Sequence, residues 1–279
     1  MITSNICLKK FVNDYSFRLD VKTVDLYQRA VGQLLAYCDK PFDEIRTKDI
    51  RNWLTYLDKE EYKPVTVKTK LAGVKLFYKY CLEEKLITHN PVVFIPFPEV
   101  EETLPHYLET EQLLRLRKHV EKCMQERAMI EVLYATGIRI GELVAIKIED
   151  IDWSERLIHI QNGKRKKARI VLFTRACEEL LRVYLEDRCD KLPFVFINTT
   201  RTGQACIRTI QKNFKNYSKA LDFPITPHTL RHTFAAHLAI KGMPLESIQV
   251  LLGHDSPHQT QLYARLYNHA RKLMYDEWM

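Results

Sequence analysis

The stretch PHTLRHTFAAHL occupies residues 227–238, and its pattern decides how the rest of the chain is interpreted. Proline is favoured in the first turn of a helix, so the stretch predicts a helix that begins after Pro227. His228 and Arg231 lie three residues apart and would project together from this helix. The free N–H groups and partial positive charge of a helix N-terminus favour a phosphate there. The stretch therefore predicts an anion-binding pair.

The same stretch has a second interpretation as a metal site. His228 and His232 are four residues apart, which is the spacing of a zinc-binding pair on a helix. The glutamate of the usual motif is absent, because Thr229 stands in its place. Zinc is therefore the weaker interpretation.

Two stretches upstream carry charged residues at useful spacings. ATGIRIGEL (135–143) places Arg139 three residues before Glu142, so both side chains can meet on one helix face. NGKRKKAR (162–169) has an Asn-Gly turn, and Lys164 follows it directly at the tip of a predicted hairpin. Taken singly, a surface ion pair and a basic loop explain these two stretches.

A third stretch, LLGHDSPHQTQLYARL (251–266), follows the first in the chain. Its helical part ends at Gly253, His254 comes next, and Tyr263 follows nine residues after that histidine. A lone tyrosine near a chain end is normally a packing residue. Its interpretation changes because arginines, a lysine and histidines precede it in the same half of the chain.

Together, these side chains could carry out phosphoryl transfer without a metal. A tyrosine hydroxyl has a pKa of ~10, so Tyr263 needs a base to take its proton, and His228 could serve. The planar guanidinium groups of Arg139 and Arg231 match the two non-bridging oxygens of a phosphodiester. His254 could donate a further hydrogen bond to the phosphate. Lys164 could give a proton to the departing sugar oxygen.

The stretches resemble the signatures of the tyrosine recombinase (phage integrase) family in order, approximate spacing and local context (ATGxR, PHxLRHxFA, LLGH, QxYxR). The family's catalytic residues match, in chain order, Arg139, Lys164, His228, Arg231, His254 and Tyr263, and its acidic residue after the first arginine matches Glu142. Lys166 and Lys167 are rivals to Lys164, and Tyr267 is a rival to Tyr263. The segment SPHQTQ before the tyrosine departs from the family's more Ser/Thr-rich pattern.

The resemblance implies a site-specific DNA recombinase in which Tyr263 forms a 3′-phosphotyrosyl bond and releases a 5′-hydroxyl. Because that bond conserves the energy of the broken one, the resemblance implies no cofactor and no metal. The implied partners are a double-stranded DNA recombination site and a homo-tetramer, or a hetero-tetramer with a second recombinase, acting through a Holliday junction. A type IB topoisomerase and a catalytically silent DNA-binding module are the alternatives.

The expected fold is mainly α and has two domains. Residues 1–95 contain short amphipathic helices and resemble the family's SAM-like core-binding domain. Residues 96–109 are expected to form a proline-rich, acidic linker. Residues 110–279 would be a mostly helical catalytic domain with a small antiparallel sheet around the Asn-Gly hairpin and a C-terminal tail helix. The short first domain leaves no room for an arm-binding domain, so an Xer-like or mobile-element recombinase is expected.

Two basic segments are candidates for contact with DNA. One is a stripe on the third predicted helix of the first domain, made of Lys68, Lys75 and Lys79. The other is the hairpin, with Arg165, Lys166 and Lys167. A solvated face is the ordinary explanation of such a stripe.

At the other end of the chain, the tail carries an apolar stripe that would pack on its own domain or on a neighbouring protomer. The stripe is made of Leu266, Ala270, Leu273 and Met274, with Trp278 nearby.

The composition agrees with a DNA-binding enzyme. Lys and Arg number 43 against 35 Asp and Glu in 279 residues, which gives a formal net charge of +8 and favours an anionic partner. Seven cysteines without a Cys-x-x-Cys pair argue against a disulfide framework and against structural zinc. We find neither a membrane-spanning stretch nor a signal core, so we expect a cytoplasmic, nucleoid-associated protein of a prokaryote or mobile element, with no membrane partner.

Overall fold

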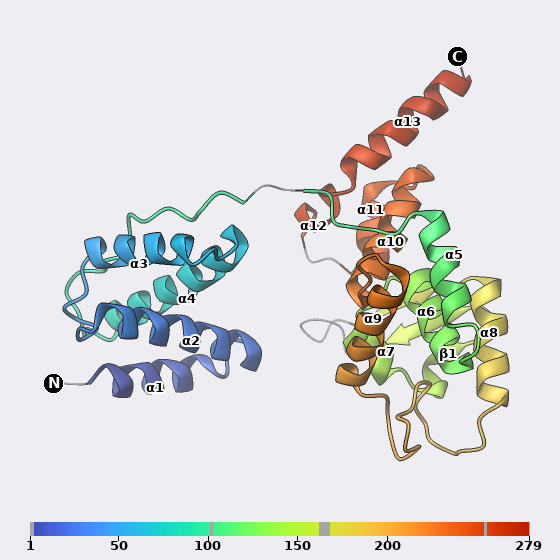
Figure 1. Cartoon of the computed structure of the whole chain (residues 1–279), viewed down its shortest axis with the longest axis horizontal. Coiled ribbons are helices and arrows are strands. Elements are labelled where there is room, and N and C mark those ends of the chain that lie inside the picture. Colours follow the sequence, from blue (N-terminus) through green and yellow to red (C-terminus); the bar gives the residue numbers. More distant parts are fainter. Residues whose placement is uncertain (1–2, 101–102, 162–167, 254–255, 279) are drawn as a thin grey trace. The chain divides into compact units, whose positions relative to one another are not determined.

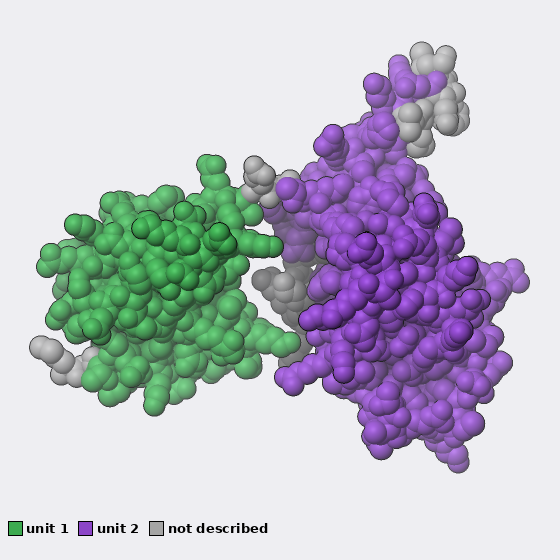
Figure 2. All heavy atoms as spheres, viewed as in Figure 1, with its two compact units in different colours: residues 1–101 green, residues 102–279 purple. Residues whose placement is uncertain are grey.

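The computed structural model describes residues 3–100, 103–161, 168–253 and 256–278. The chain divides into two compact units, residues 1–101 and 102–279 (Figures 1 and 2). Each unit has its own hydrophobic core, and no core cluster draws residues from both among the residues described. The fold is mainly helical with one small antiparallel sheet, which confirms the predicted fold class.

The segment predicted as a linker, residues 96–109, is held at both ends. Val92 and Ile95, just before it, are buried in the core of unit 1. Leu108 is buried in the core of unit 2, and its backbone N–H donates to the Thr233 hydroxyl. Both ends of the connection are therefore anchored by apolar side chains, each to its own unit.

Unit 1 is a bundle of four helices: α1 (Ser4–Tyr15), α2 (Val21–Cys38), α3 (Thr47–Lys59) and α4 (Pro64–Glu83). The apolar faces expected of the amphipathic helices in residues 1–95 form its core, with Leu34, Trp53 and Leu71 fully buried. On helix α1, Cys7 and Phe11 complete the same core. The buried residues of α1, Cys7, Leu8, Phe11 and Tyr15, recur at helical spacing, so the signal for this helix was present in the sequence.

Unit 2 surrounds a central helix, α10 (Pro227–Ile240), which packs against α6 (Met124–Thr136), α11 (Leu245–Leu252) and α13 (Ala264–Trp278) (Figure 1). The Thr226 hydroxyl caps α10 by accepting from the Thr229 backbone N–H, and Pro227 occupies the first turn. Three of its small residues, Ala235, Ala236 and Ala239, are fully buried. Small side chains let neighbouring helices approach α10 closely, so this helix can place polar groups beside several other elements.

The other helices of unit 2 are α5 (Thr110–His119), α7 (Ile140–Ala145), α8 (Arg175–Glu186), α9 (Ile207–Leu221) and α12 (His258–Gln261), with a short 3₁₀ turn at Ile148–Asp150. The antiparallel sheet has the order β1 (Ile151–Asp152), β2 (Leu157–Ile160) and β3 (Arg169–Leu172). Ile158 pairs with Val171, and both are buried. The predicted strand pair is therefore confirmed, whereas β1 was not predicted. Among the described residues, no helix is long and apolar enough to cross a membrane.

Two glycines in the middle of unit 1 helices differ in what surrounds them. A Cβ added at Gly73 on α4 would lie 3.0 Å from the backbone Cα of Tyr27 on α2, whereas a Cβ at Gly32 would meet nothing within 4 Å. We expect Gly73→Ala to lower the free energy of unfolding by about 1–3 kcal/mol, because α2 and α4 must separate.

Gly32→Ala is the matched control and should raise the free energy of unfolding by about 0.5–1 kcal/mol, because alanine is the better helix former. Urea unfolding of the full chain, followed by circular dichroism, measures both. A Gly73→Ala variant as stable as the parent chain would contradict the close packing of α2 on α4.

Candidate active site

The site begins at the junction between α6 and α7. Gly137 ends α6 in the left-handed conformation, with φ 62°, and a Cβ there would collide with the Phe234 ring. Arg139 then caps α7: its backbone N–H donates to Glu142 Oε2 at 2.7 Å, and its Nη1 donates to Glu142 Oε1 at 3.0 Å. Arg139 and Glu142 therefore meet at the start of one helix, as their spacing indicated.

The two predicted arginines converge on the C-terminal end of α11. Arg231 Nη1 donates to the Gly137 carbonyl at 2.5 Å, and Nη2 donates to the Leu252 carbonyl at 2.7 Å. Arg139 Nη2 donates to the next carbonyl, that of Gly253, at 3.3 Å. The carbonyls at a helix C-terminus carry partial negative charge, so they hold both guanidinium groups in place without DNA.

Arg231 is a buried cation, with 5% of its surface exposed. Burial and the positive charge of Arg139 lower the pKa of Arg231 to about 9, so the guanidinium is still charged at neutral pH. A buried charge is stable only when its donors are satisfied, and the two carbonyls satisfy it here. An anion that displaced these carbonyls would pair with the Arg231 guanidinium. Because water solvates this buried cation poorly, the attraction would be strong.

Glu142 is also buried and is the negative centre of the site. Besides Arg139, it accepts two parallel bonds from Arg169 on β3, Nη1 to Oε1 at 2.7 Å and Nη2 to Oε2 at 2.8 Å. Burial alone would raise the pKa of Glu142, but the hydrogen bonds from Arg169 and from the Arg139 backbone outweigh it and hold the pKa at about 2. The sequence reasoning did not single out Arg169, although it is the last residue of the basic NGKRKKAR stretch.

Tyr263 lies in a buried position between α12 and α13, with 1% of its surface exposed. Its ring packs in a cluster with Ala235, Ile248 and Leu252. Burial raises the pKa of its hydroxyl, and the positive charge of Arg231 opposes part of that rise. In this conformation the phenol is protonated and shielded from solvent.

The partner of the Tyr263 hydroxyl is His232, whose Nδ1 lies 2.6 Å away. Burial, reinforced by the neighbouring His228 and Arg231, lowers the pKa of His232 to about 4, so the ring is neutral and shares a hydrogen bond with the protonated phenol. The sequence predicts His228 as the base and indicates His232 only as half of a zinc pair. The contact between Tyr263 and His232 joins two separate segments, so no local pattern could have indicated it.

His228 lies one turn before His232 on α10, with 6.5 Å between the ring centroids. Desolvation and the positive charges of Arg231 and Arg139 lower its pKa, which favours the neutral form that a base needs. Part of the His228 side chain is exposed at the first turn of the helix, where a substrate could reach it. Its role as base stays a prediction.

Several predicted residues lie outside the described residues. They are Lys164, Arg165, Lys166 and Lys167 of the hairpin, and His254 after α11. The side chains of Leu273, Met274 and Trp278 in the tail stripe also lie outside the description, whereas Leu266 packs with the Tyr263 cluster and Ala270 is buried. The first part of the tail therefore docks on its own domain.

The lysine stripe of α4 has mixed surroundings. Lys68 is exposed, Lys75 lies over the Phe97 ring at 4.5 Å, and Lys79 forms an exposed ion pair with Glu83 at 3.7 Å. Contact of this stripe with DNA stays a prediction.

A second basic stripe, which is not among the predictions from the sequence, follows one face of α9. Its exposed members are Arg208, Lys212, Lys215 and Lys219. Their helical spacing was visible in the sequence.

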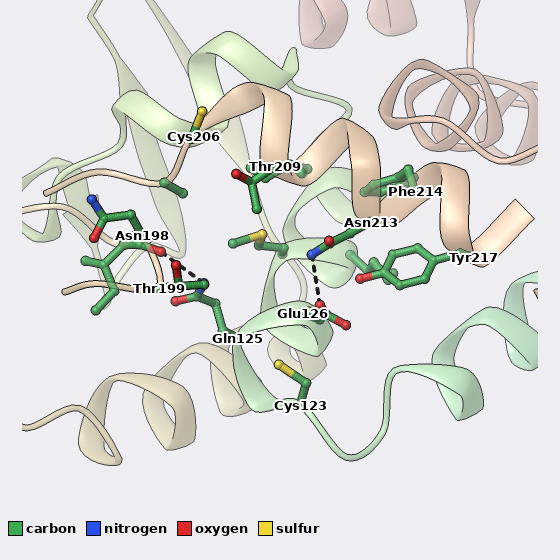
Figure 3. Close-up of a pocket in the computed structure, with 15 residues that line it drawn as sticks. Cys123, Gln125, Glu126, Asn198, Thr199, Cys206, Thr209, Asn213, Phe214 and Tyr217 are labelled. Atoms are coloured by element: carbon green, nitrogen blue, oxygen red, sulfur yellow. Dashed lines mark hydrogen bonds between the residues drawn. The ribbon is translucent and has the colours of Figure 1, made fainter. Parts of the chain in front are cut away.

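A separate cavity of about 150 Å³ lies between α6 and α9 (Figure 3). Its lining is mainly apolar, and two of the lining residues are hydrogen-bonded, with Asn213 Nδ2 donating to Glu126 Oε1 at 3.0 Å. The residues that line it include none of the predicted catalytic residues. The cavity is therefore separate from the arginine cluster.

The pKa of Glu142 predicts how stability depends on pH. Its folded-state pKa of about 2 lies below the ordinary 4.5, so its stabilising contribution is complete above pH 4.5 and is lost as the pH falls toward 2. We expect Glu142→Gln to lower the free energy of unfolding by about 3 kcal/mol at pH 7, and by progressively less below pH 4.5.

Urea unfolding of both proteins at pH 7, 4 and 3 measures this difference. Glu149→Gln is the control, because Glu149 is an exposed carboxylate paired with Lys147. A difference between the parent and Glu142→Gln that is as large at pH 3 as at pH 7 would contradict the ionised, buried carboxylate.

The chain matches known proteins over most of its length. Residues 106–269 match the phage integrase family, and residues 14–88 match the family described as phage integrase, N-terminal SAM-like domain. A tyrosine recombinase XerC of Anoxybacillus flavithermus is 31% identical over 271 residues, which cover 91% of this chain and 90% of that protein. A tyrosine recombinase XerD of Listeria innocua is 31% identical over 279 residues, with 93% of each chain covered.

Structural comparison gives the same fold. The crystal structure of a lambda integrase dimer bound to a COC′ core site has a TM-score of 0.78 and 22% identity, and covers 92% of this chain and 97% of that one. The family match spans more than half of the chain, and the relatives above 30% identity extend over both units. The chain therefore belongs to the phage integrase family and is a tyrosine recombinase.

Proposed function

We propose that this recombinase cleaves and rejoins double-stranded DNA at a specific site through a covalent bond to Tyr263. The observation that carries the proposal is the convergence of Arg139 and Arg231, from separate segments, on the same end of α11. Two charged forks held side by side fit the two non-bridging oxygens of one phosphodiester. Arg231 is also close enough to Tyr263 to affect the pKa of its hydroxyl.

The proposed reaction is a transesterification. The Tyr263 oxygen attacks phosphorus, and its proton passes to a histidine, either the predicted base His228 or the resting partner His232. The bond from phosphorus to the 5′ oxygen breaks, and Lys164 gives that oxygen a proton. Attack by a 5′-hydroxyl on the phosphotyrosyl bond reverses these steps and rejoins the strand, so the cycle consumes no cofactor.

The resting conformation requires a change before this chemistry. Tyr263 is buried and hydrogen-bonded, and Arg231 is occupied by backbone carbonyls. We infer that DNA binding draws the arginines onto the phosphate and releases the phenol from His232. An enzyme with this resting state does not expose a nucleophile to DNA before its arginines hold a phosphate.

The DNA partner is proposed from the basic surfaces and from the relatives. The hairpin, the α4 stripe and the exposed face of α9 together supply cations for phosphate contacts, which dominate affinity for DNA. The similar lambda integrase structure is a dimer bound to a core site. We propose a tetramer on two such sites, with a Holliday junction between the two strand exchanges and the tail helix as one element of assembly.

Substitution of the nucleophile tests the proposal. We expect Tyr263→Phe to abolish covalent attachment to DNA while leaving DNA affinity within about twofold, because binding is spread over many phosphates. The substrate is a duplex recovered by sequencing DNA bound to the purified chain, nicked beside the scissile phosphate so that the released strand diffuses away. The adduct is measured by denaturing gel electrophoresis.

Tyr267→Phe is the matched control, since it removes a hydroxyl from the neighbouring rival tyrosine and should retain the adduct. An adduct that survives in Tyr263→Phe would overturn the assignment of the nucleophile. Relaxation of a supercoiled plasmid without a specific site, and without recombinant products, would indicate a topoisomerase instead.

A further inference from the structure

Arg169 connects three parts of the active site. It is the first residue of β3, directly after the basic hairpin, and 12% of its side-chain surface is exposed. Its two terminal nitrogens pair in parallel with the two oxygens of Glu142, whose side chain is 4% exposed. Glu142 in turn holds both the backbone and the guanidinium of Arg139. Arg169 can therefore act on Arg139 through one shared carboxylate.

The stem of Arg169 also lies against the end of α11. A Cβ added at Gly253 would be 2.7 Å from Arg169 Cδ and 2.9 Å from Nε, and Gly253 has a φ of 62°. The Gly253 carbonyl accepts the hydrogen bond from Arg139, and His254, a predicted catalytic residue, follows Gly253 in the chain. Arg169 therefore lies beside Glu142, which holds Arg139, and beside Gly253, which precedes His254. The proposed phosphate would bind between these two groups.

Arg169 Nε is buried and has no hydrogen-bond partner in the part of the chain that the structure describes. Buried donors are normally satisfied, and exceptions concentrate at functional sites. The two terminal nitrogens of Arg169 each donate one hydrogen bond to an oxygen of Glu142. The orientation of the side chain therefore allows both bonds to Glu142 but leaves Nε without a partner among the described residues.

The charges around Glu142 show what this pairing achieves. Among the described residues, Arg139, Arg169 and Arg231 surround a single carboxylate, which leaves two positive charges. In the transition state of phosphoryl transfer, negative charge spreads over the non-bridging oxygens. If Glu142 had Arg139 as its main partner, it would compete with the phosphate for that guanidinium. Arg169 occupies both carboxylate oxygens and reduces this competition.

We propose that Arg169 is a positioning residue for DNA cleavage, which saturates Glu142 and sets the orientation of Arg139 toward a non-bridging oxygen of the scissile phosphate. This inference rests on the proposed function. Arg169 touches neither the DNA nor the nucleophile in this scheme. Its effect on the reaction passes through Arg139 and should depend on the charge of the oxygen that Arg139 meets.

The experiment measures single-turnover cleavage of the nicked duplex by the full chain at saturating protein. We expect Arg169→Gln to slow cleavage about 100-fold, the loss typical of a small misplacement at a reacting centre, with DNA affinity within about threefold. Arg169→Lys keeps the charge but loses the planar fork, and should fall between the parent and Arg169→Gln. Arg188→Gln is the matched control, because it breaks another buried, doubly bonded pair, with Asp190, outside the site.

A second substrate separates positioning from a fold defect. A methylphosphonate at the scissile position replaces one charged oxygen by a methyl group and removes the charge that Arg139 would meet. The 100-fold deficit of Arg169→Gln should then shrink below about tenfold. A general fold defect would slow cleavage equally on both substrates.

The outcomes distinguish the inference from the function beneath it. A parent chain that forms no adduct on either substrate would overturn the proposed function. A parent chain that cleaves, together with Arg169→Gln that is equally fast, would overturn only the role of Arg169. That role would also be overturned if the deficit is unchanged on the methylphosphonate, or if Arg188→Gln reproduces it.

Discussion

The buried guanidinium of Arg231 is the constraint on which the rest of the site depends. A cation with so little exposure needs acceptors on every side, and the chain supplies the carbonyls of Gly137 and Leu252 from two different helix ends. Gly137 can offer its carbonyl because it turns in the left-handed region at the end of α6. The termini of α6 and α11 are thereby tied to helix α10, and the proposed phosphate site depends on this arrangement.

The second constraint is the burial of Tyr263, the proposed nucleophile. Tyr263 is held between apolar side chains and a neutral histidine, so its proton is not lost in the resting enzyme. The same α10 helix carries Arg231, His232 and the alanines against which the phenol packs. Movement of Tyr263 away from α10 would break one hydrogen bond and expose apolar surface. The free energy for that step would have to come from DNA contacts or from assembly.

The helical fold and the contact of Arg139 with Glu142 could be predicted from the sequence, because both depend on local patterns. Pro227 indicated the start of α10, and the spacing of Arg139 and Glu142 indicated a shared helix face. The Asn-Gly turn between β-branched runs indicated β2 and β3. The amphipathic pattern of residues 1–95 indicated the helical core of unit 1. What could not be predicted arises from contacts between distant segments: the pairings of Tyr263 with His232 and of Arg169 with Glu142 leave no repeated spacing in the chain.

Mapping the covalent attachment by mass spectrometry tests the central claim most directly. Trypsin cleaves after Lys241 and Arg265, so Tyr263 falls in the peptide 242–265 and Tyr267 falls in the peptide 266–271. After reaction with the nicked duplex and nuclease digestion, we predict a nucleotide remnant on peptide 242–265, linked through its single tyrosine. A remnant on peptide 266–271, or on any peptide of residues 1–241, would contradict the account.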